Sequence, residues 1–147
     1  MYFVDVGEIE KRLTYMDQLI AQFKNEPKDQ TTTYRLASER YVDVVVEVIL
    51  DVGHQVIDGF LMRDAGSYED IITILLEEDV ISERNAVVYK DFIRLRKKVR
   101  KSYTSIERAE IEQMIHDNQD AITSYTNDIR NYIKNHDGVA HIFHQDI

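Results

Sequence analysis

Cysteine and tryptophan are absent from this chain of 147 residues, which has one proline and five glycines. Without cysteine there is no disulfide to support the fold and no thiolate for chemistry, which fits a reducing cytoplasm. Few prolines and glycines disfavour a turn-rich β-sandwich and favour long helices. The 18 Lys and Arg residues are outnumbered by 27 Asp and Glu, giving a net charge of -9. This balance argues against a protein that coats nucleic acid over its whole surface.

Long hydrophobic runs are also missing. Acidic residues interrupt the apolar stretches well before the roughly 20 residues that a membrane span needs. The first residues, MYFVDVGEIEKR, contain no basic region followed by an apolar run. We therefore expect a cytoplasmic protein without membrane contact. The length suits a single domain over residues 1–147, which can bury roughly two thirds of the surface that its unfolded chain exposes.

Apolar residues recur at spacings of three and four, which predicts helices. The first helix runs from Gly7 to about Glu26, and Pro27 follows its end. The second runs from Thr31 to Leu61, and its wide apolar surface predicts a central position.

Three further helices complete the expected fold. They are a short helix after the capping-box pair Ser67 and Asp70, a helix from Ser82 into residues 94–101, and a last helix from the pair Thr104 and Glu107 to about Asn135. The tail VAHIFHQDI shows no clear period. We expect an all-α helical bundle of four long helices and one short helix.

Positive charge is gathered near the end of the fourth expected helix. Six of the eighteen Lys and Arg residues lie there: Arg94, Arg96, Lys97, Lys98, Arg100 and Lys101. Cations near a helix C-terminus stabilise the helix dipole, but one or two serve that purpose. Six indicate an anionic partner such as phosphate or nucleic acid, or an acidic face within the protein.

An acidic stripe on the second helix competes for these cations. Asp43, Glu47 and Asp51 recur every four residues, and like charges at this spacing destabilise an isolated helix by about 0.2–0.5 kcal/mol per pair. Opposite charges from elsewhere in the fold should therefore offset this repulsion. If the stripe faces the arginines, the basic residues are partly a structural ion network and fewer of them are free for a ligand.

Metal and cofactor sites have little support. Asp51 and His54 supply half of the acid-x-x-His pattern of two-metal helical bundles, but we find no second pair and expect no metal site. His141 and His144 lack a third ligand and are expected to be exposed. Gly-rich phosphate loops and zinc motifs are absent, so we expect no cofactor.

The nine tyrosines offer a second route to nucleic acid, because aromatic rings stack on bases. Most of them, including Tyr15, Tyr125 and Tyr132, fall on the apolar faces of the expected helices. Core packing is therefore the favoured interpretation.

The residues from Arg94 to Tyr103, RLRKKVRKSY, resemble the motif of the HepT family of the HEPN superfamily. Those all-α proteins are toxins of toxin-antitoxin pairs and metal-independent ribonucleases. Their signature is an Arg, four residues, a His, one residue and a Tyr. Arg96 and Tyr103 match its ends, and Lys101 stands at the His position. VDVGEIEKRLTYMDQLI and LDVGHQVIDGFLMRDAGSYEDIITILLEEDVI extend the similarity, which is greatest to a solitary Firmicutes branch.

The resemblance implies that Arg96 holds the scissile phosphate and that Lys101 takes the place of the general acid/base. The other cations, Arg94, Lys97, Lys98 and Arg100, would contact RNA phosphates. An unperturbed lysine has a pKa of about 10.4 and keeps its proton at neutral pH. Loss of nuclease activity with retention of phosphate binding is therefore the more economical interpretation.

The resemblance also implies partners. A homodimer would bring two basic segments into one cleft, and an MntA-type nucleotidyltransferase antitoxin would silence the toxin by adding AMP to Tyr103. Two functions remain open. One is an RNA-binding or ribonuclease-type protein of toxin-antitoxin lineage. The alternative is a non-enzymatic homodimer that docks residues 94–101 on an acidic partner.

Overall fold

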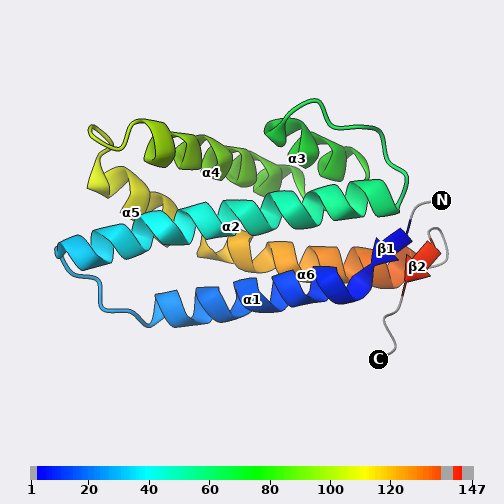
Figure 1. Ribbon diagram of the computed structural model, residues 1–147, viewed down its shortest axis with the longest axis horizontal. Helices are drawn as coiled ribbons and strands as arrows, with labels where there is room; N and C mark the ends of the chain where they lie inside the picture. The colour runs from blue at the N-terminus through cyan, green and yellow to red at the C-terminus, as the bar shows by residue number, and fades with distance from the viewer. Residues whose placement is uncertain (1–2, 137–140, 144–147) are drawn as a thin grey trace.

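The computed structural model describes residues 3–136 and 141–143, and this part of the chain is helical except for two short strands. The helices are α1 (Val6–Lys24), α2 (Thr32–Gly59), α3 (Tyr68–Glu77), α4 (Glu83–Lys101), α5 (Arg108–Asp117) and α6 (Gln119–His136). The strands are β1 (Phe3–Asp5) and β2 (His141–Phe143). Figure 1 shows the long helices lying side by side along one axis. The predicted all-α bundle is confirmed.

Side-chain caps begin α2, α3 and α4, as the Asp5 carboxylate does for α1. The Thr31 hydroxyl accepts a hydrogen bond from the backbone N–H of Tyr34 at the start of α2. Ser67 caps α3 and Ser82 caps α4 in the same way. Each cap satisfies an amide that has no partner within the first helical turn. All three starts agree with the predictions from the sequence.

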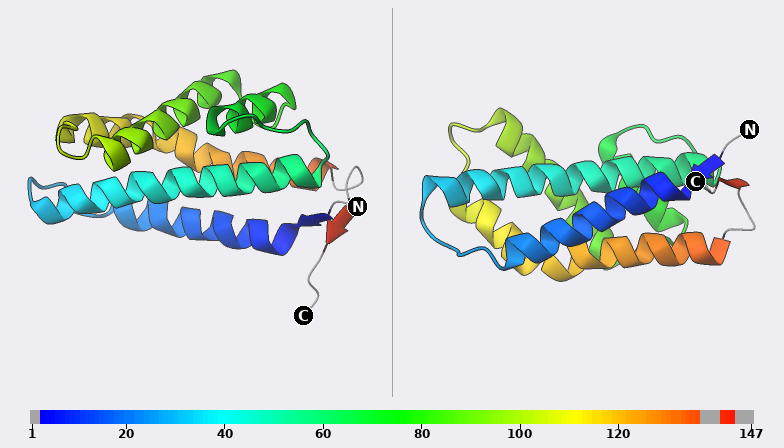
Figure 2. Two further views of the ribbon diagram at one scale, coloured as in Figure 1. Left: turned by 45° about the horizontal axis from the view of Figure 1, so that its top comes forward. Right: turned by 60° about the horizontal axis from the view of Figure 1, so that its bottom comes forward.

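The central helix is α2, which packs against α1, α3 and α4 (Figure 2). Its fully buried side chains are Val42, Val45, Val46, Ile49, Val52 and Val56. From α6, the buried Tyr125 hydroxyl donates a hydrogen bond to the carbonyl oxygen of Ile49 at 2.7 Å. The polar end of this core tyrosine is thus satisfied, as burial requires.

The expected capping box between Thr104 and Glu107 does not form. α5 begins at Arg108, and Glu107 makes no side-chain cap hydrogen bond. The chain turns instead at the end of α4, where the N–H groups of Ser105 and Ile106 both donate to the carbonyl oxygen of Ser102. These backbone bonds use the amides just before α5 without help from Thr104.

The prediction of a single last helix is also wrong, because a break at Asn118 separates α5 from α6. The Asn118 side-chain amide donates to the carbonyl oxygen of Met114 at 2.8 Å. This bond occupies a carbonyl of the last turn of α5 and competes with continuation of the helix. Buried Ile115 and Ile122 keep the apolar spacing across the break, so periodicity alone cannot reveal it.

The strands join the two described ends of the chain. β1 pairs with β2 in parallel, with Val4 opposite Ile142. The sequence gives no signal for this pairing because three residues are too few for a period to be read. The exposure predicted for His141 and His144 concerns side chains outside the described residues. Among the described residues, no helix has both the length and the apolar character needed to cross a bilayer.

Candidate functional site

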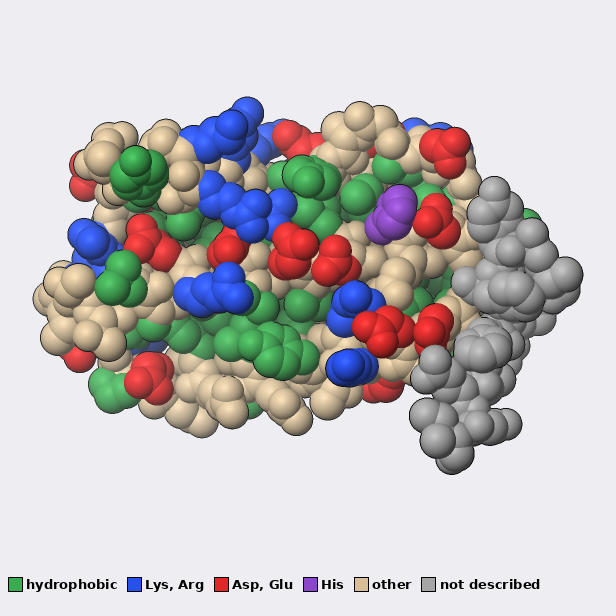
Figure 3. All heavy atoms as spheres, viewed as in Figure 1, with side chains coloured by type: hydrophobic (Ala, Val, Ile, Leu, Met, Phe, Trp, Pro, Cys, Tyr) green, Lys and Arg blue, Asp and Glu red, His purple; other side chains and the backbone are tan. Residues whose placement is uncertain are grey.

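Residues 94–101, the basic segment, form the last two turns of α4. Leu95 is buried and Val99 is half-buried, so this side of the segment faces the core. The helix ends where the N–H of Ser102 donates to the carbonyl oxygen of Lys98 at 2.7 Å. Figure 3 shows Lys and Arg side chains gathered over α4 and facing a row of acidic side chains along α2. The two rows lie on the same face of the molecule.

Arg96 is the buried member of the segment, with 4% of its surface exposed. Its Nη1 donates a hydrogen bond to Oε2 of Glu47 on α2 at 2.6 Å. The guanidinium carbon also lies 5.6 Å from the ring centroid of Tyr68, the first residue of α3. A buried arginine is held best by a carboxylate and an aromatic face together. The motif arginine is therefore fixed by contacts from two other helices.

Arg100 lies one turn after Arg96 and contacts the same helix. Its Nη2 lies 2.7 Å from Oδ1 of Asp43, one turn before Glu47 on α2. Of the two possibilities that the sequence left open, the structure supports an acidic stripe that faces these arginines, through Asp43 and Glu47. Alternation of the two signs across the helix contact offsets the repulsion within the stripe.

Two more cations of the segment pair with carboxylates from other elements. Arg94 contacts Glu69 of α3 at 2.6 Å, and this hydrogen bond raises the pKa of the arginine. Lys98 contacts Glu110 of α5 at 2.7 Å. Lys97 and Lys101 are exposed and form no ion pair with any residue in the described ranges. Four of the six cations thus belong to an internal ion network.

Tyr103 lies in the turn just after α4 with 71% of its surface exposed. Lys101, at the position of the family histidine, is likewise exposed rather than buried among the other cations. Both side chains are therefore open to solvent and to a partner. Of the tyrosines expected in the core, Tyr125 is fully buried, but Tyr15 is 54% exposed, so that prediction is wrong for Tyr15.

Asp51 and His54 do not act as a pair. His54 Nε2 contacts Oδ2 of Asp58 at 3.1 Å, whereas Asp51 lies 3.9 Å from Arg12. Within residues 3–136 and 141–143, no group of three or more His, Asp or Glu side chains is arranged to hold a metal ion.

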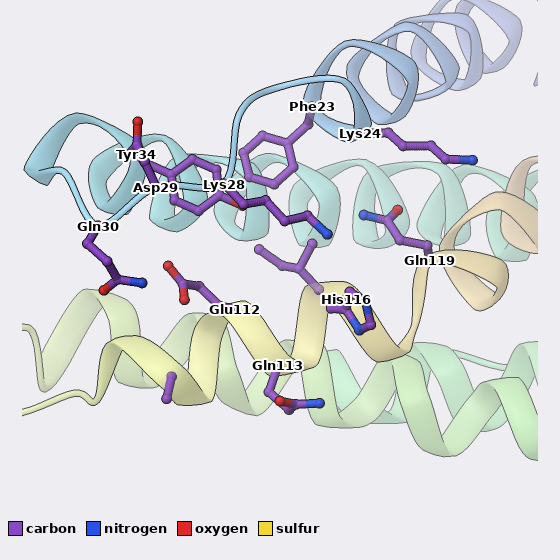
Figure 4. A pocket seen from close by; sticks show the side chains of 12 residues that line it. Phe23, Lys24, Lys28, Asp29, Gln30, Tyr34, Glu112, Gln113, His116 and Gln119 are labelled. Carbon is purple, nitrogen blue, oxygen red and sulfur yellow. The ribbon is translucent and has the colours of Figure 1, made fainter.

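Tyr68 is a residue that the sequence did not single out. It is 61% exposed, it contacts Arg96, and it lines a hollow of about 420 Å³ together with residues of α2. Only the packing of α3 beside α4 places it next to the motif arginine. A second hollow, of about 640 Å³, lies between the α1–α2 connection and α5 (Figure 4). Its lining mixes Lys24 and Lys28 with Glu112 and includes no residue of the basic segment.

Comparison with known proteins decides the family. The family model described as "Ribonuclease HepT-like" matches residues 9–129. The chain belongs to the HepT-like ribonuclease family. A relative from Bacillus subtilis (strain 168), named "Putative RNase YutE", is 36% identical over 143 residues, which cover 97% of this chain and 99% of the relative.

The HepT-like assignment agrees with the fold. The solved structure described as "Cytosolic Protein of Unknown Function YutE from Bacillus subtilis" matches with a TM-score of 0.86 at 36% identity. The match covers 92% of this chain and 94% of that one. A ribonuclease-type function is therefore supported for this chain.

Proposed function

We propose that this HepT-like protein binds RNA through the basic segment, with Arg96 as the clamp for one phosphate. The arrangement of Arg96 carries the proposal. Glu47 and Tyr68 hold its guanidinium in place beside exposed cations. Arginine binds phosphate in a bidentate manner, so a phosphate would take the place of Glu47 while the Tyr68 ring keeps the guanidinium positioned.

The remaining cations fall into two groups. Lys97 and Lys101 are exposed and can contact phosphates without leaving a carboxylate of the described residues. Arg94, Lys98 and Arg100 already contact carboxylates, so each would exchange a carboxylate for a phosphate oxygen. This exchange costs little at an exposed site, where ion pairs contribute about 0–1 kcal/mol. The three paired cations should therefore contribute less to RNA affinity than Lys97 and Lys101 do.

Cleavage needs a group that takes the proton of the attacking 2′-hydroxyl. Lys101 occupies that position, and lysine is less suited than histidine to take and return a proton near neutral pH. RNA binding without rapid cleavage is the expected behaviour of the native chain, and any cleavage would be metal-independent. Two copies, joined so that their basic segments share a cleft, would double the positive charge facing one RNA strand. Sedimentation of the purified protein would report this homodimer.

The direct test compares Arg96→Ala with Arg84→Ala, an exposed arginine at the other end of α4. Binding of a labelled single-stranded RNA is measured by anisotropy, and cleavage is followed on gels with a chelator present. We expect Arg96→Ala to weaken RNA binding at least tenfold and Arg84→Ala to leave it near the native value. Circular dichroism confirms that both variants are folded. Equal binding by the native chain and folded Arg96→Ala would refute the phosphate clamp.

The toxin-antitoxin role rests on Tyr103, whose exposure suits attack on a nucleotide. We propose that an MntA-type nucleotidyltransferase transfers AMP from ATP to its hydroxyl, which loses its proton as the bond between the α- and β-phosphates breaks and pyrophosphate leaves. Mass spectrometry after co-expression with such an enzyme should show the added AMP in the native chain and not in Tyr103→Phe. An unmodified native chain would remove this part of the proposal.

A non-enzymatic interaction protein is the second candidate, and the exposure of Lys97 and Lys101 is the observation that favours it. These two cations fit an acidic protein surface as well as they fit a phosphate chain. Competition separates the two functions. Polyglutamate should displace RNA poorly if phosphate geometry matters, and it should compete on equal terms if charge alone is recognised.

A further inference from the structure

The hollow beside Tyr68 has the shape and lining of a site for a flat ring. Its volume is about 420 Å³, and it lies between α2 and the start of α3. Buried Leu50 and Ile71 line it with apolar surface, and the exposed ring of Tyr68 forms another side. Aromatic and aliphatic walls of this kind hold unstacked bases of single-stranded nucleic acid.

Tyr68 connects this hollow to the proposed phosphate clamp. Its ring borders the hollow and also lies against the guanidinium of Arg96, 5.6 Å from ring centroid to guanidinium carbon. Arg96 itself does not line the hollow. A nucleotide carries its base and its phosphate on one sugar, so a single nucleotide can reach both places at once.

Besides Tyr68, the polar side chains that line the hollow are Arg12 of α1 and Asp51, His54 and Gln55 of α2, and Arg12 Nε lies 3.9 Å from Oδ2 of Asp51. Asp51 and Gln55 are one turn apart on α2 and both line the hollow. The Asp51 carboxylate accepts no hydrogen bond from any described residue. The Gln55 Oε1 already accepts a hydrogen bond from Arg12 at 3.2 Å, which leaves its NH₂ group as the free donor.

We propose that this hollow binds a guanine base of single-stranded RNA, an inference that rests on the proposed function because it assigns the base beside the phosphate at Arg96. Guanine presents two adjacent donors, N1–H and N2–H, next to the acceptor O6. Asp51 would accept from both donors, and Gln55 would donate to O6. Adenine and cytosine place a ring nitrogen acceptor beside their amino group, and uracil has a single N–H between two carbonyls. Each would set an acceptor against the carboxylate.

The surroundings of Asp51 favour a ligand with donors. Burial raises the pKa of its carboxyl group, and the neighbouring charge of Glu47 raises it further, while Arg12, Arg96 and His54 act in the opposite direction. A carboxylate that is partly removed from water and lacks hydrogen bonds gains more from two N–H donors than an exposed one would.

The test measures binding of four labelled nine-nucleotide RNAs by anisotropy: a uridine strand with guanosine, adenosine, inosine or uridine at its centre. Gels confirm that the strands remain intact. We expect the native chain to bind the guanosine strand about tenfold more tightly than the adenosine strand, since one well-placed base contact pair discriminates by this order. Inosine lacks the N2 amino group and should fall between the two.

Three variants locate the preference. Asp51→Asn should remove the discrimination between guanosine and adenosine while leaving the uridine strand bound. Tyr68→Leu should lower the affinity for both purine strands about tenfold through lost stacking, and Tyr68→Phe should restore it. Tyr15→Leu, which changes an exposed tyrosine of α1 outside the hollow, is the matched control.

The outcomes separate this inference from the proposed function. Equal affinity of the native chain for guanosine and adenosine strands, with binding still lost in Arg96→Ala, overturns the guanine subsite and leaves the phosphate clamp standing. A guanosine preference that survives Asp51→Asn also overturns it. Failure of the native chain to bind any of the four RNAs overturns the proposed function itself.

Discussion

Lys101 stands where the motif that this chain resembles has its histidine. It sits at the exposed end of α4, within the same eight residues as Arg96. Histidine titrates near neutral pH and can both take and return a proton, whereas lysine stays protonated there. Under the proposed function, the identity of this side chain decides between binding RNA and cleaving it.

We predict that Lys101→His confers metal-independent cleavage. General acid–base catalysis contributes on the order of a hundredfold or more in rate. Cleavage in the presence of a chelator should rise by that factor, depend on the 2′-hydroxyl, and increase with pH through about 6.5 as the imidazole loses its proton. Lys101→Gln, which removes the charge alone, is the control. Equal rates for the two variants would show that proton transfer at this position is not what the native chain lacks.

Glu47 is the residue that competes with phosphate for Arg96. Glu47→Gln should lower the free energy of unfolding by about 1 kcal/mol, a modest amount because the Glu47 side chain is 54% exposed. RNA affinity should rise several-fold, since the guanidinium then has no carboxylate to leave. Glu39→Gln on the same helix changes the net charge equally and is the control. A matching rise in that variant would attribute the effect to net charge.

Asp70 gives the clearest dependence of stability on pH. Hydrogen bonds from Arg63 lower the pKa of its carboxyl group from 3.8 to about 2. The folded chain binds this proton more weakly than the unfolded chain, so the stabilisation is complete above about pH 4 and is lost as the pH falls through 2. Asp70→Asn should therefore melt below the native chain at pH 7, and the gap should close toward pH 2. Asp64→Asn, an exposed neighbour, should show no such convergence.

Among the elements, α2 and α3 approach closely at Gly53. A Cβ atom at this position would lie 2.8 Å from Cγ2 of Ile71 and 3.3 Å from the hydroxyl of Tyr125. Both neighbours are buried and cannot withdraw into solvent. The close contact between the helices therefore requires glycine at position 53, because overpacking a dense core is destabilising.

We expect Gly53→Ala to lower the free energy of unfolding by about 1–3 kcal/mol. Gly7→Ala is the matched control, because a Cβ atom there meets only Oδ1 of Asp5 at an ordinary 3.5 Å. That variant should be unchanged or more stable by about 0.5–1 kcal/mol, since alanine favours a helix over glycine. Urea unfolding measures both. Equal stability of Gly53→Ala and the native chain would mean that α3 can shift away from α2.

The elements also show what the sequence could predict. The position of the basic segment and the shared face of Asp43 and Glu47 follow from spacings of four residues, which a helix converts directly into one face. The meeting of these two faces was only an open hypothesis, because it depends on how α4 packs against α2. Tyr68 could not be found in this way. Its contact with Arg96 depends on how α3 packs beside α4, and no local pattern reports that packing. The division at Asn118 was missed because the apolar period continues through it.

At the scale of the whole molecule, a net charge of -9 must be reconciled with RNA binding. The pairing of four cations in the basic segment with carboxylates lowers the local positive potential before RNA arrives. Association is therefore sensitive to how many of these pairs open.

The dependence of RNA affinity on salt concentration reports how many cations have left their carboxylates to contact phosphates. Each phosphate neutralised on a single strand contributes about -0.7 to the slope of log affinity against log salt concentration. Contacts from Arg96, Lys97 and Lys101 alone predict a slope of about -2.1, and contacts from all six cations predict about -4.2. We expect a value between these limits, and Lys97→Ala should reduce its magnitude by about 0.7. A slope near zero would exclude phosphate contacts altogether.

The short pairing of β1 with β2 also determines how the protein would respond to force. Because the two strands are parallel, pulling on opposite ends of the chain slides one strand along the other and loads their hydrogen bonds together rather than one at a time. The helices carry no tension until the two strands separate. A stretched molecule should therefore show a first small rupture, the separation of β1 from β2, before the helical bundle extends.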